Sequence, residues 1–169
     1  MNYQHQDAIW EAHYAIKKIP ALYQGLCDAF LMQEGDQAEK KFPGDLIAGQ
    51  DGISATLLGV TLVAKPRPVF VAGSEFVVEF AFRPLQHPDA KAICLIYLTL
   101  SGILKRGLTS DSDNICNYDN RFVRDYLLNE LGIALLNSNL YAPEPVGDGG
   151  QLGGLDTIIQ RMTQTQWGK

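Results

Sequence analysis

Apolar residues recur every three or four positions near the start of the chain, as they do along one side of an amphipathic helix. The residues that share this side are Ile9, Ala12, Ile16, Ile19, Tyr23, Leu26, Cys27 and Phe30. The spacing predicts a helix over residues 3–33. Pro20 removes one helical hydrogen bond inside it, so we expect a kink, or two helices that meet near residues 18–20.

The middle of the chain has the pattern of β-strands. Residues 53–64 (ISATLLGVTLVA) predict one strand, which the prolines of KPRP should end. Residues 75–83 (EFVVEFAFR) alternate, so Phe76, Val78, Phe80 and Phe82 share one face. Residues 92–100 (AICLIYLTL) are apolar on both faces, which predicts a central strand covered on both sides, with a second copy of the protein as one possible cover.

A second amphipathic helix is predicted towards the C-terminus, over residues 120–137. A short strand is expected after Ser101-Gly102, and residues 35–52 and 109–120 are expected to be loops. This order predicts a two-layer α+β fold, in which an N-terminal and a C-terminal helix pack on an antiparallel sheet of about four to five strands. Residues 1–146 form the expected single domain, and residues 147–169 form a Gly-rich connector and a short C-terminal tail of the same domain.

Charge and cysteine content restrict the classes of partner. The 169-residue chain has a formal net charge of -5, and its lysines and arginines are scattered, so we expect no nucleic-acid binding. The longest apolar run is too short for a membrane-spanning helix, and the N-terminus lacks a signal-peptide pattern, so we expect no membrane partner. Three cysteines without paired spacing fit reduced thiols, and the expected location is the cytoplasm.

The segment GDGGQLGG, residues 147–154, looks at first like a phosphate-binding loop. Such a loop connects a strand to a helix N-terminus, whereas this segment follows PEP, and Leu152 occupies the position of the third glycine of the dinucleotide pattern. The composition instead predicts a flexible connector.

No pattern of residues predicts catalysis, a metal site or a cofactor. His5 and His13 are two helical turns apart, and the spacing of Glu75 and Glu79 along a strand exceeds that of a glycosidase pair. Cys116 precedes the second predicted helix, but neighbouring aspartates disfavour a thiolate, so we expect a structural thiol. The sequence therefore predicts no catalytic residues, no metal ligands and no cofactor.

Two short segments, ALLNSNL at residues 134–140 and LGGLD at residues 152–156, resemble a passage of type III secretion chaperones, which are also small, acidic α+β dimers. The resemblance covers roughly a tenth of the chain. Those chaperones have further strands after this passage, where this sequence has a short tail, so we assign no family on this basis.

Two functional hypotheses follow. The first is a non-enzymatic, cytoplasmic protein-binding module, such as an adaptor, an inhibitor or an immunity-type factor, which can form a homodimer through the doubly apolar strand. The second is a small-molecule-binding protein or enzyme with a pocket between the Phe-rich strand and the N-terminal helix. Its ligand-binding residues would be His13, Phe76, Phe80, Phe82 and Tyr97.

Overall fold

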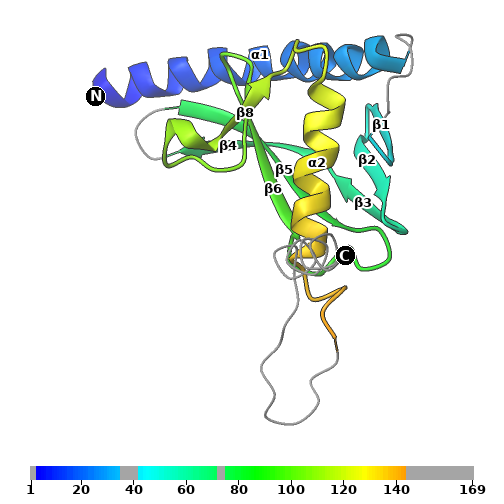
Figure 1. The fold of residues 1–169 in the computed structure, drawn as a ribbon. Helices are drawn as coiled ribbons and strands as arrows, with labels where there is room; N and C mark the ends of the chain where they lie inside the picture. The colour runs from blue at the N-terminus through cyan, green and yellow to red at the C-terminus, as the bar shows by residue number, and fades with distance from the viewer. Residues whose placement is uncertain (1–2, 35–41, 72–74, 144–169) are drawn as a thin grey trace.

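A computed structural model describes residues 3–34, 42–71 and 75–143, which form an α+β fold with one curled antiparallel sheet (Figure 1). The two helices and one 3-10 turn are α1 (Tyr3–Glu34), η1 (Asp111–Asp113) and α2 (Val123–Leu136). The strands are β1 (Asp45–Gly49), β2 (Gly52–Leu57), β3 (Val60–Ala64), β4 (Pro66–Val71), β5 (Glu75–Pro84), β6 (Cys94–Thr99), β7 (Ile103–Lys105) and β8 (Asn114–Asn117). The α+β class and antiparallel sheet are confirmed, but the sheet has eight strands rather than four to five.

Strand β5 is central to the sheet, because it pairs with β3, β4 and β6. The strand order is β1-β2-β3-β5-β6-β7-β8, and β4 also pairs with β5. Strand β3 pairs with the end of β5, where Val63 lies opposite Arg83, while β4 pairs with its first part, where Arg67 lies opposite Glu79. The sheet therefore forks at Lys65, the residue between β3 and β4.

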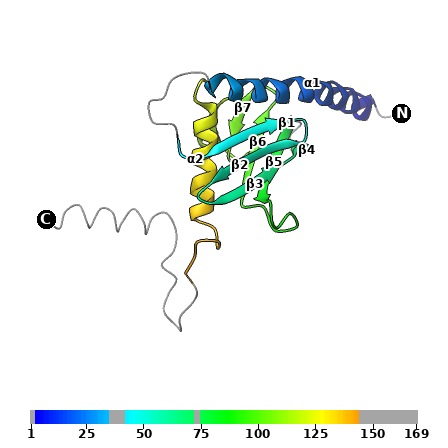
Figure 2. The ribbon, with the colours of Figure 1, turned by 90° about the vertical axis from the view of Figure 1, so that its right-hand side faces the viewer.

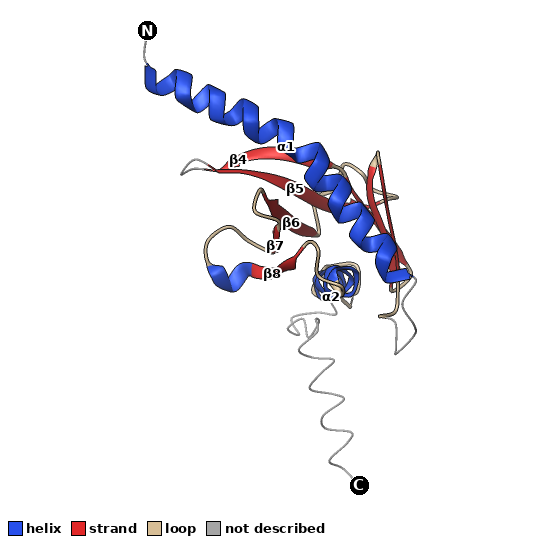
Figure 3. Cartoon of the chain, turned by 90° about the horizontal axis from the view of Figure 1, so that it is seen from above, coloured by secondary structure: helices blue, strands red, loops and turns tan. Residues whose placement is uncertain are grey.

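Both helices pack on the same face of the sheet, which we call the inner face. The sheet curls around α2, which is seen end-on in Figure 3, while α1 lies across the strands (Figure 2). On β5 the inner face carries Val78, Phe80 and Phe82, all buried in one core with Leu26 of α1 and Leu127 of α2. The outer face has no helix packed on it within the described residues.

Helix α1 runs through Pro20 without being divided into two helices. Pro20 and Ile16 are both exposed, so water can reach the carbonyl that loses its helical partner. The helix packs on the core from Ala15 onward, and its earlier turns extend past the edge of the sheet (Figures 2 and 3). The predicted apolar side is therefore buried only in its second part, and Ile9 and Ile16 remain exposed.

Several strand boundaries differ from the expectation. Residues 53–64 form two strands, because Leu58 and Gly59 both have positive φ, as in the tight turns of hairpins. The prolines of KPRP lie in β4, which pairs with β5 on one side only, where a missing donor is tolerated. The segments expected to be loops contain β1 and β8. The strand over 75–83 and the helix over 120–137 are confirmed as β5 and α2, and residues 147–169 lie outside the described residues.

Candidate functional site

The five candidate ligand-binding residues do not gather around one cavity. Phe80 and Phe82 are buried in the core, and the Phe80 ring centroid is 6.0 Å from that of Tyr23 on α1. Phe76 is half-buried at the start of β5. His13 is exposed on α1. Tyr97 lies on β6, where it pairs with Glu79 of β5 and shares the outer face of the sheet with it. Core side chains thus fill the space between β5 and α1 at Phe80.

A cleft of about 700 Å³ lies largely on the outer face, at the fork of the sheet. We call it the outer-face cleft. Its charged lining residues are Asp51, Lys65, Arg67, Glu79 and Arg83, and much of its remaining wall comes from Ile53, Val63, Ala64, Ala81, Leu85 and Pro88. The volume falls within the ~300–1,000 Å³ typical of small-molecule sites, and the lining combines apolar walls with a few polar groups, as those sites do.

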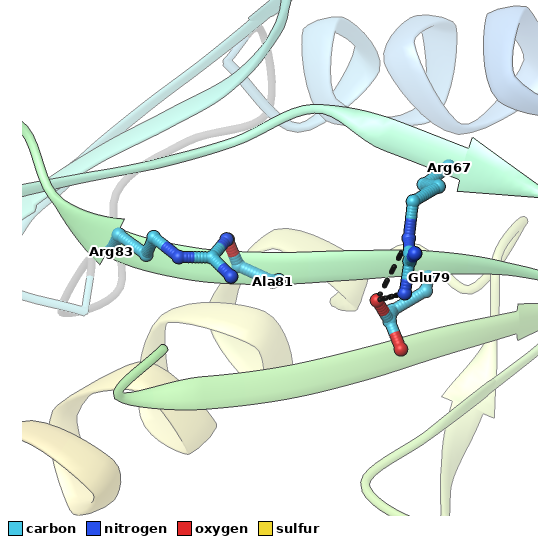
Figure 4. A network of polar contacts seen from close by, with 4 residues as sticks. All are labelled: Arg67, Glu79, Ala81 and Arg83. Atoms are coloured by element: carbon cyan, nitrogen blue, oxygen red, sulfur yellow. Dashed lines mark hydrogen bonds and ion pairs between the residues drawn. The ribbon is translucent and has the colours of Figure 1, made fainter. Parts of the chain in front are cut away.

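An ion pair between Arg67 of β4 and Glu79 of β5 forms part of the lining of the cleft (Figure 4). The Nη2 and Nε atoms of Arg67 donate to Oε1 of Glu79 at 2.7 and 3.2 Å. The Glu79 side chain is only 12% exposed, whereas that of Arg67 is 68% exposed. This arginine is therefore already neutralised within the protein.

Arg83 lies two residues beyond Ala81 on β5, and its side chain runs back along the strand towards Ala81 (Figure 4). Two backbone carbonyls fix its guanidinium group. Its Nε donates to the Ala90 carbonyl at 2.9 Å and its Nη1 to the Ala81 carbonyl at 3.2 Å. A guanidinium has five N–H groups, so three remain for other partners. None of the described carboxylates forms an ion pair with Arg83.

Lys65 and Asp51 complete the charged lining of the cleft. Both are exposed, and neither forms an ion pair with any residue in the described ranges. Asp51 lies in the turn before β2 and Lys65 directly follows β3. The start of β2 and the end of β3 are neighbours in the sheet, because Ile53 is opposite Ala64. With Arg67 and Glu79 paired, the cleft keeps two cations, Lys65 and Arg83, against one carboxylate.

Tyr97 lies beside the ion pair, on the next strand. Burial raises the pKa of its phenol, and the Glu79 carboxylate raises it further, while the Arg67 guanidinium opposes this. Tyr97 therefore stays protonated at neutral pH and can donate a hydrogen bond.

A second exposed feature is the first half of α1. Ile9, Trp10, Tyr14 and Ile16 are 69%, 59%, 59% and 48% exposed. The Trp10 and Tyr14 rings stack at 6.2 Å between centroids, and His13 contacts both edge-on at 6.1 Å. We call these five residues, Ile9, Trp10, His13, Tyr14 and Ile16, the α1 aromatic surface. Exposed apolar clusters of this kind are typical of sites of protein association.

The three cysteines are all free thiols with raised pKa values. Burial raises the pKa of Cys94 to about 12, with a further contribution from Glu130, and that of Cys116 to about 11. Burial also raises the pKa of Cys27. A reactive cysteine needs a lowered pKa, so these thiols have the opposite property. Among the residues that the structure describes, no group of three or more histidine, cysteine, aspartate or glutamate side chains could hold a metal ion.

The acidic loop before α2 uses its central carboxylate for its own structure. The Asp113 carboxylate accepts hydrogen bonds from the backbone N–H groups of Thr109 and Ser110 and from the Thr109 hydroxyl, at 3.0 to 3.1 Å. These bonds lower the pKa of Asp113, with the Thr109 hydroxyl as the largest cause. Cys116, expected in a loop, lies half-buried on β8.

Neither described helix is long and apolar enough to cross a membrane. No known protein family matches the chain, and no curated protein or solved structure is detectably similar to it. The segment GDGGQLGG lies outside the described residues. The two features of the described residues that bear on function are the α1 aromatic surface and the outer-face cleft.

Proposed function

We propose that this protein works by binding another protein, as an adaptor, inhibitor or immunity-type factor, and not by catalysis. The observation that carries the proposal is the α1 aromatic surface, which places large apolar side chains in solvent on turns that extend past the sheet. Trp and Tyr are enriched among the residues that dominate binding energy in protein interfaces. The raised pKa values of the thiols support a role without a cysteine nucleophile. The free thiols also support a location in the cytoplasm, where cysteines stay reduced.

The partner that fits this surface best is a second copy of the chain. Asp7 and Glu11 lie in the first turns of α1, and Lys17 and Lys18 follow Tyr14 about one turn later, all exposed. In an antiparallel pair of α1 helices, the acidic turns of one copy meet the basic turns of the other. The outer face of β6 is a weaker candidate for this contact, because Glu79 and Lys105 lie on either side of Tyr97.

Native mass spectrometry and sedimentation equilibrium of the full chain test the proposal. We expect a dimer, and we expect the double variant Trp10→Ala/Tyr14→Ala to raise its dissociation constant roughly tenfold or more. Tyr126→Ala, which removes an exposed tyrosine from α2, is the matched control and should leave the constant unchanged. A monomer at all accessible concentrations, or a dimer indifferent to the double variant, would contradict the proposal.

Charge reversal gives an independent test of the antiparallel arrangement. Lys17→Glu/Lys18→Glu should weaken the dimer by removing the attraction to the acidic turns. Mixing that variant with Asp7→Lys/Glu11→Lys should restore association as a heterodimer, because the charges are then complementary again. Failure of the mixture to associate would exclude this arrangement.

A further inference from the structure

The outer-face cleft has the charge balance of an anion site, although the whole chain is acidic. Its two cations without an ion-pair partner among the described residues, Lys65 and Arg83, stand against one carboxylate, Asp51, which leaves a surplus of one positive charge. The formal net charge of -5 of the whole chain disfavours anions on the rest of its surface. The outer-face cleft therefore attracts anions, in contrast to the acidic chain as a whole.

Arg83 is prepared for this role before any ligand arrives. Its guanidinium is anchored to the Ala81 and Ala90 carbonyls, and three of its N–H groups remain available. An anchored arginine loses less conformational freedom on binding than a free one does. Ser54 faces the same cleft, on the other side of Val63 from Arg83, and its hydroxyl can add a hydrogen bond.

The apolar walls of the cleft favour a ligand with an apolar body. Val63, Leu85 and Pro88 line it, and Ala81 forms a small floor between Glu79 and Arg83, which are roughly 13 Å apart along β5 by the rise per residue. A larger side chain at position 81 would fill this space. A small inorganic ion could use the cations but would leave these apolar walls in contact with water.

We propose that the outer-face cleft binds a small organic monocarboxylate, whose carboxylate contacts Arg83 and Lys65 and whose apolar body lies over Ala81 and Val63. The surplus of a single positive charge matches a monoanion, and the unpaired Asp51 carboxylate repels ions of higher charge. The α1 aromatic surface plays no part in this site, so the inference stands independently of the proposed protein-binding function.

Calorimetric titration of the full chain with 2-naphthoate and the neutral 2-naphthamide tests the ligand class, because the two probes share one apolar body. We expect 2-naphthoate to bind at one site, with roughly tenfold or greater preference over the amide. Equal affinities, no saturable binding of either 2-naphthoate or octanoate, or tighter binding of inorganic phosphate would overturn the assignment.

Variants then locate the site. Arg83→Gln and Lys65→Gln should each weaken 2-naphthoate roughly tenfold or more, and Ala81→Trp should abolish binding by filling the floor. Arg121→Gln removes an exposed arginine outside the cleft and is the matched control. Because Arg83 also donates to the Ala90 carbonyl, circular dichroism should verify that its variant folds. The Lys65 ammonium group forms no ion pair with the described residues, so Lys65→Gln still tests the site if Arg83→Gln fails to fold. Unchanged affinity in both Lys65→Gln and Ala81→Trp would refute the site.

Discussion

A single glycine fixes the hairpin that borders the outer-face cleft. Gly52 has φ +132°, and a Cβ there would lie 2.2 Å from the Ala64 carbonyl oxygen, a backbone atom that cannot turn aside. Gly49, in the same hairpin, has no atom within 4 Å of the corresponding position. These two positions therefore separate backbone strain from the general effect of adding a methyl group.

We predict that Gly52→Ala lowers the free energy of unfolding by about 2–4 kcal/mol, through the strained φ and the clash with Ala64. Gly49→Ala should change it by less than about 0.5 kcal/mol. Urea unfolding of both variants measures the difference. Equal effects of the two substitutions would contradict the described approach of β2 and β3.

The raised thiol pKa values predict a loss of stability at alkaline pH. Folding raises the pKa of Cys116 from its ordinary value of 9.0 to about 11 and that of Cys94 to about 12. Between pH 9 and 11 the unfolded chain loses these protons while the folded chain keeps them, so the unfolded state binds fewer protons and stability falls as pH rises. Below pH 9 both states hold the protons, and this contribution is constant.

Urea unfolding between pH 7 and pH 11 measures this slope, and the ultraviolet absorbance of thiolates in the native protein reports the titration directly. The variant Cys94→Ala/Cys116→Ala should have a shallower slope over the same range, although tyrosines such as Tyr97 still contribute near its upper end. Thiolate absorbance that rises in the native protein near pH 9 would show that the thiols are not protected.

Among the elements, α1 carries a proline where most helices would not tolerate one. We predict that Pro20→Ala raises the free energy of unfolding by about 1–3 kcal/mol, because it restores a hydrogen bond at an exposed position. The neighbouring exposed Ala21→Gly is the control and should lower stability by about 1 kcal/mol. A loss of stability in Pro20→Ala would mean that the proline acts mainly by restricting the unfolded chain.

Elements with a strong hydrophobic period were predictable from the sequence, and so was the short strand β7 after Ser101-Gly102, whereas β1, β4 and β8 were not predicted. The alternation around Phe80 identified β5, and the apolar stripe containing Leu127 and Leu131 identified α2. Strand β4 was missed because Pro66 and Pro68 are incompatible with a central strand, yet they are tolerated where only one side is paired. The turn at Leu58 was missed because an aliphatic residue rarely adopts φ 52°.

The outer-face cleft could not be predicted at all from local patterns. Asp51, Lys65 and Arg83 come from three separate segments, and each alone has the pattern of an ordinary solvent-exposed residue. They meet only because β3 and β4 pair with the same strand. The Phe-rich strand, by contrast, was recognised correctly, but Phe80 and Phe82 pack in the core on the opposite face.

At the scale of the whole molecule, one core joins both helices to the sheet, and Phe80 is fully buried in it. We predict that Phe80→Ala lowers the free energy of unfolding by about 3–5 kcal/mol. Phe70→Ala removes a ring of β4 that is 58% exposed and should cost less than about 1 kcal/mol. Helical circular dichroism and amide exchange of β5 should shift together in Phe80→Ala, and separate transitions would contradict a shared core.

Because the sheet forks at Lys65, strand β5 contributes side chains to both the core and the outer-face cleft. Its even-numbered residues from Val78 to Phe82 fill the core, and its odd-numbered residues from Glu79 to Arg83 shape the cleft. Inserting or deleting one residue would exchange the two sets, placing charges in the core and phenylalanines in the cleft. Substitutions along β5 can therefore be tolerated in natural and engineered variants of this protein, but insertions and deletions within the strand cannot. The core residues and the cleft residues of β5 must keep the same register relative to each other.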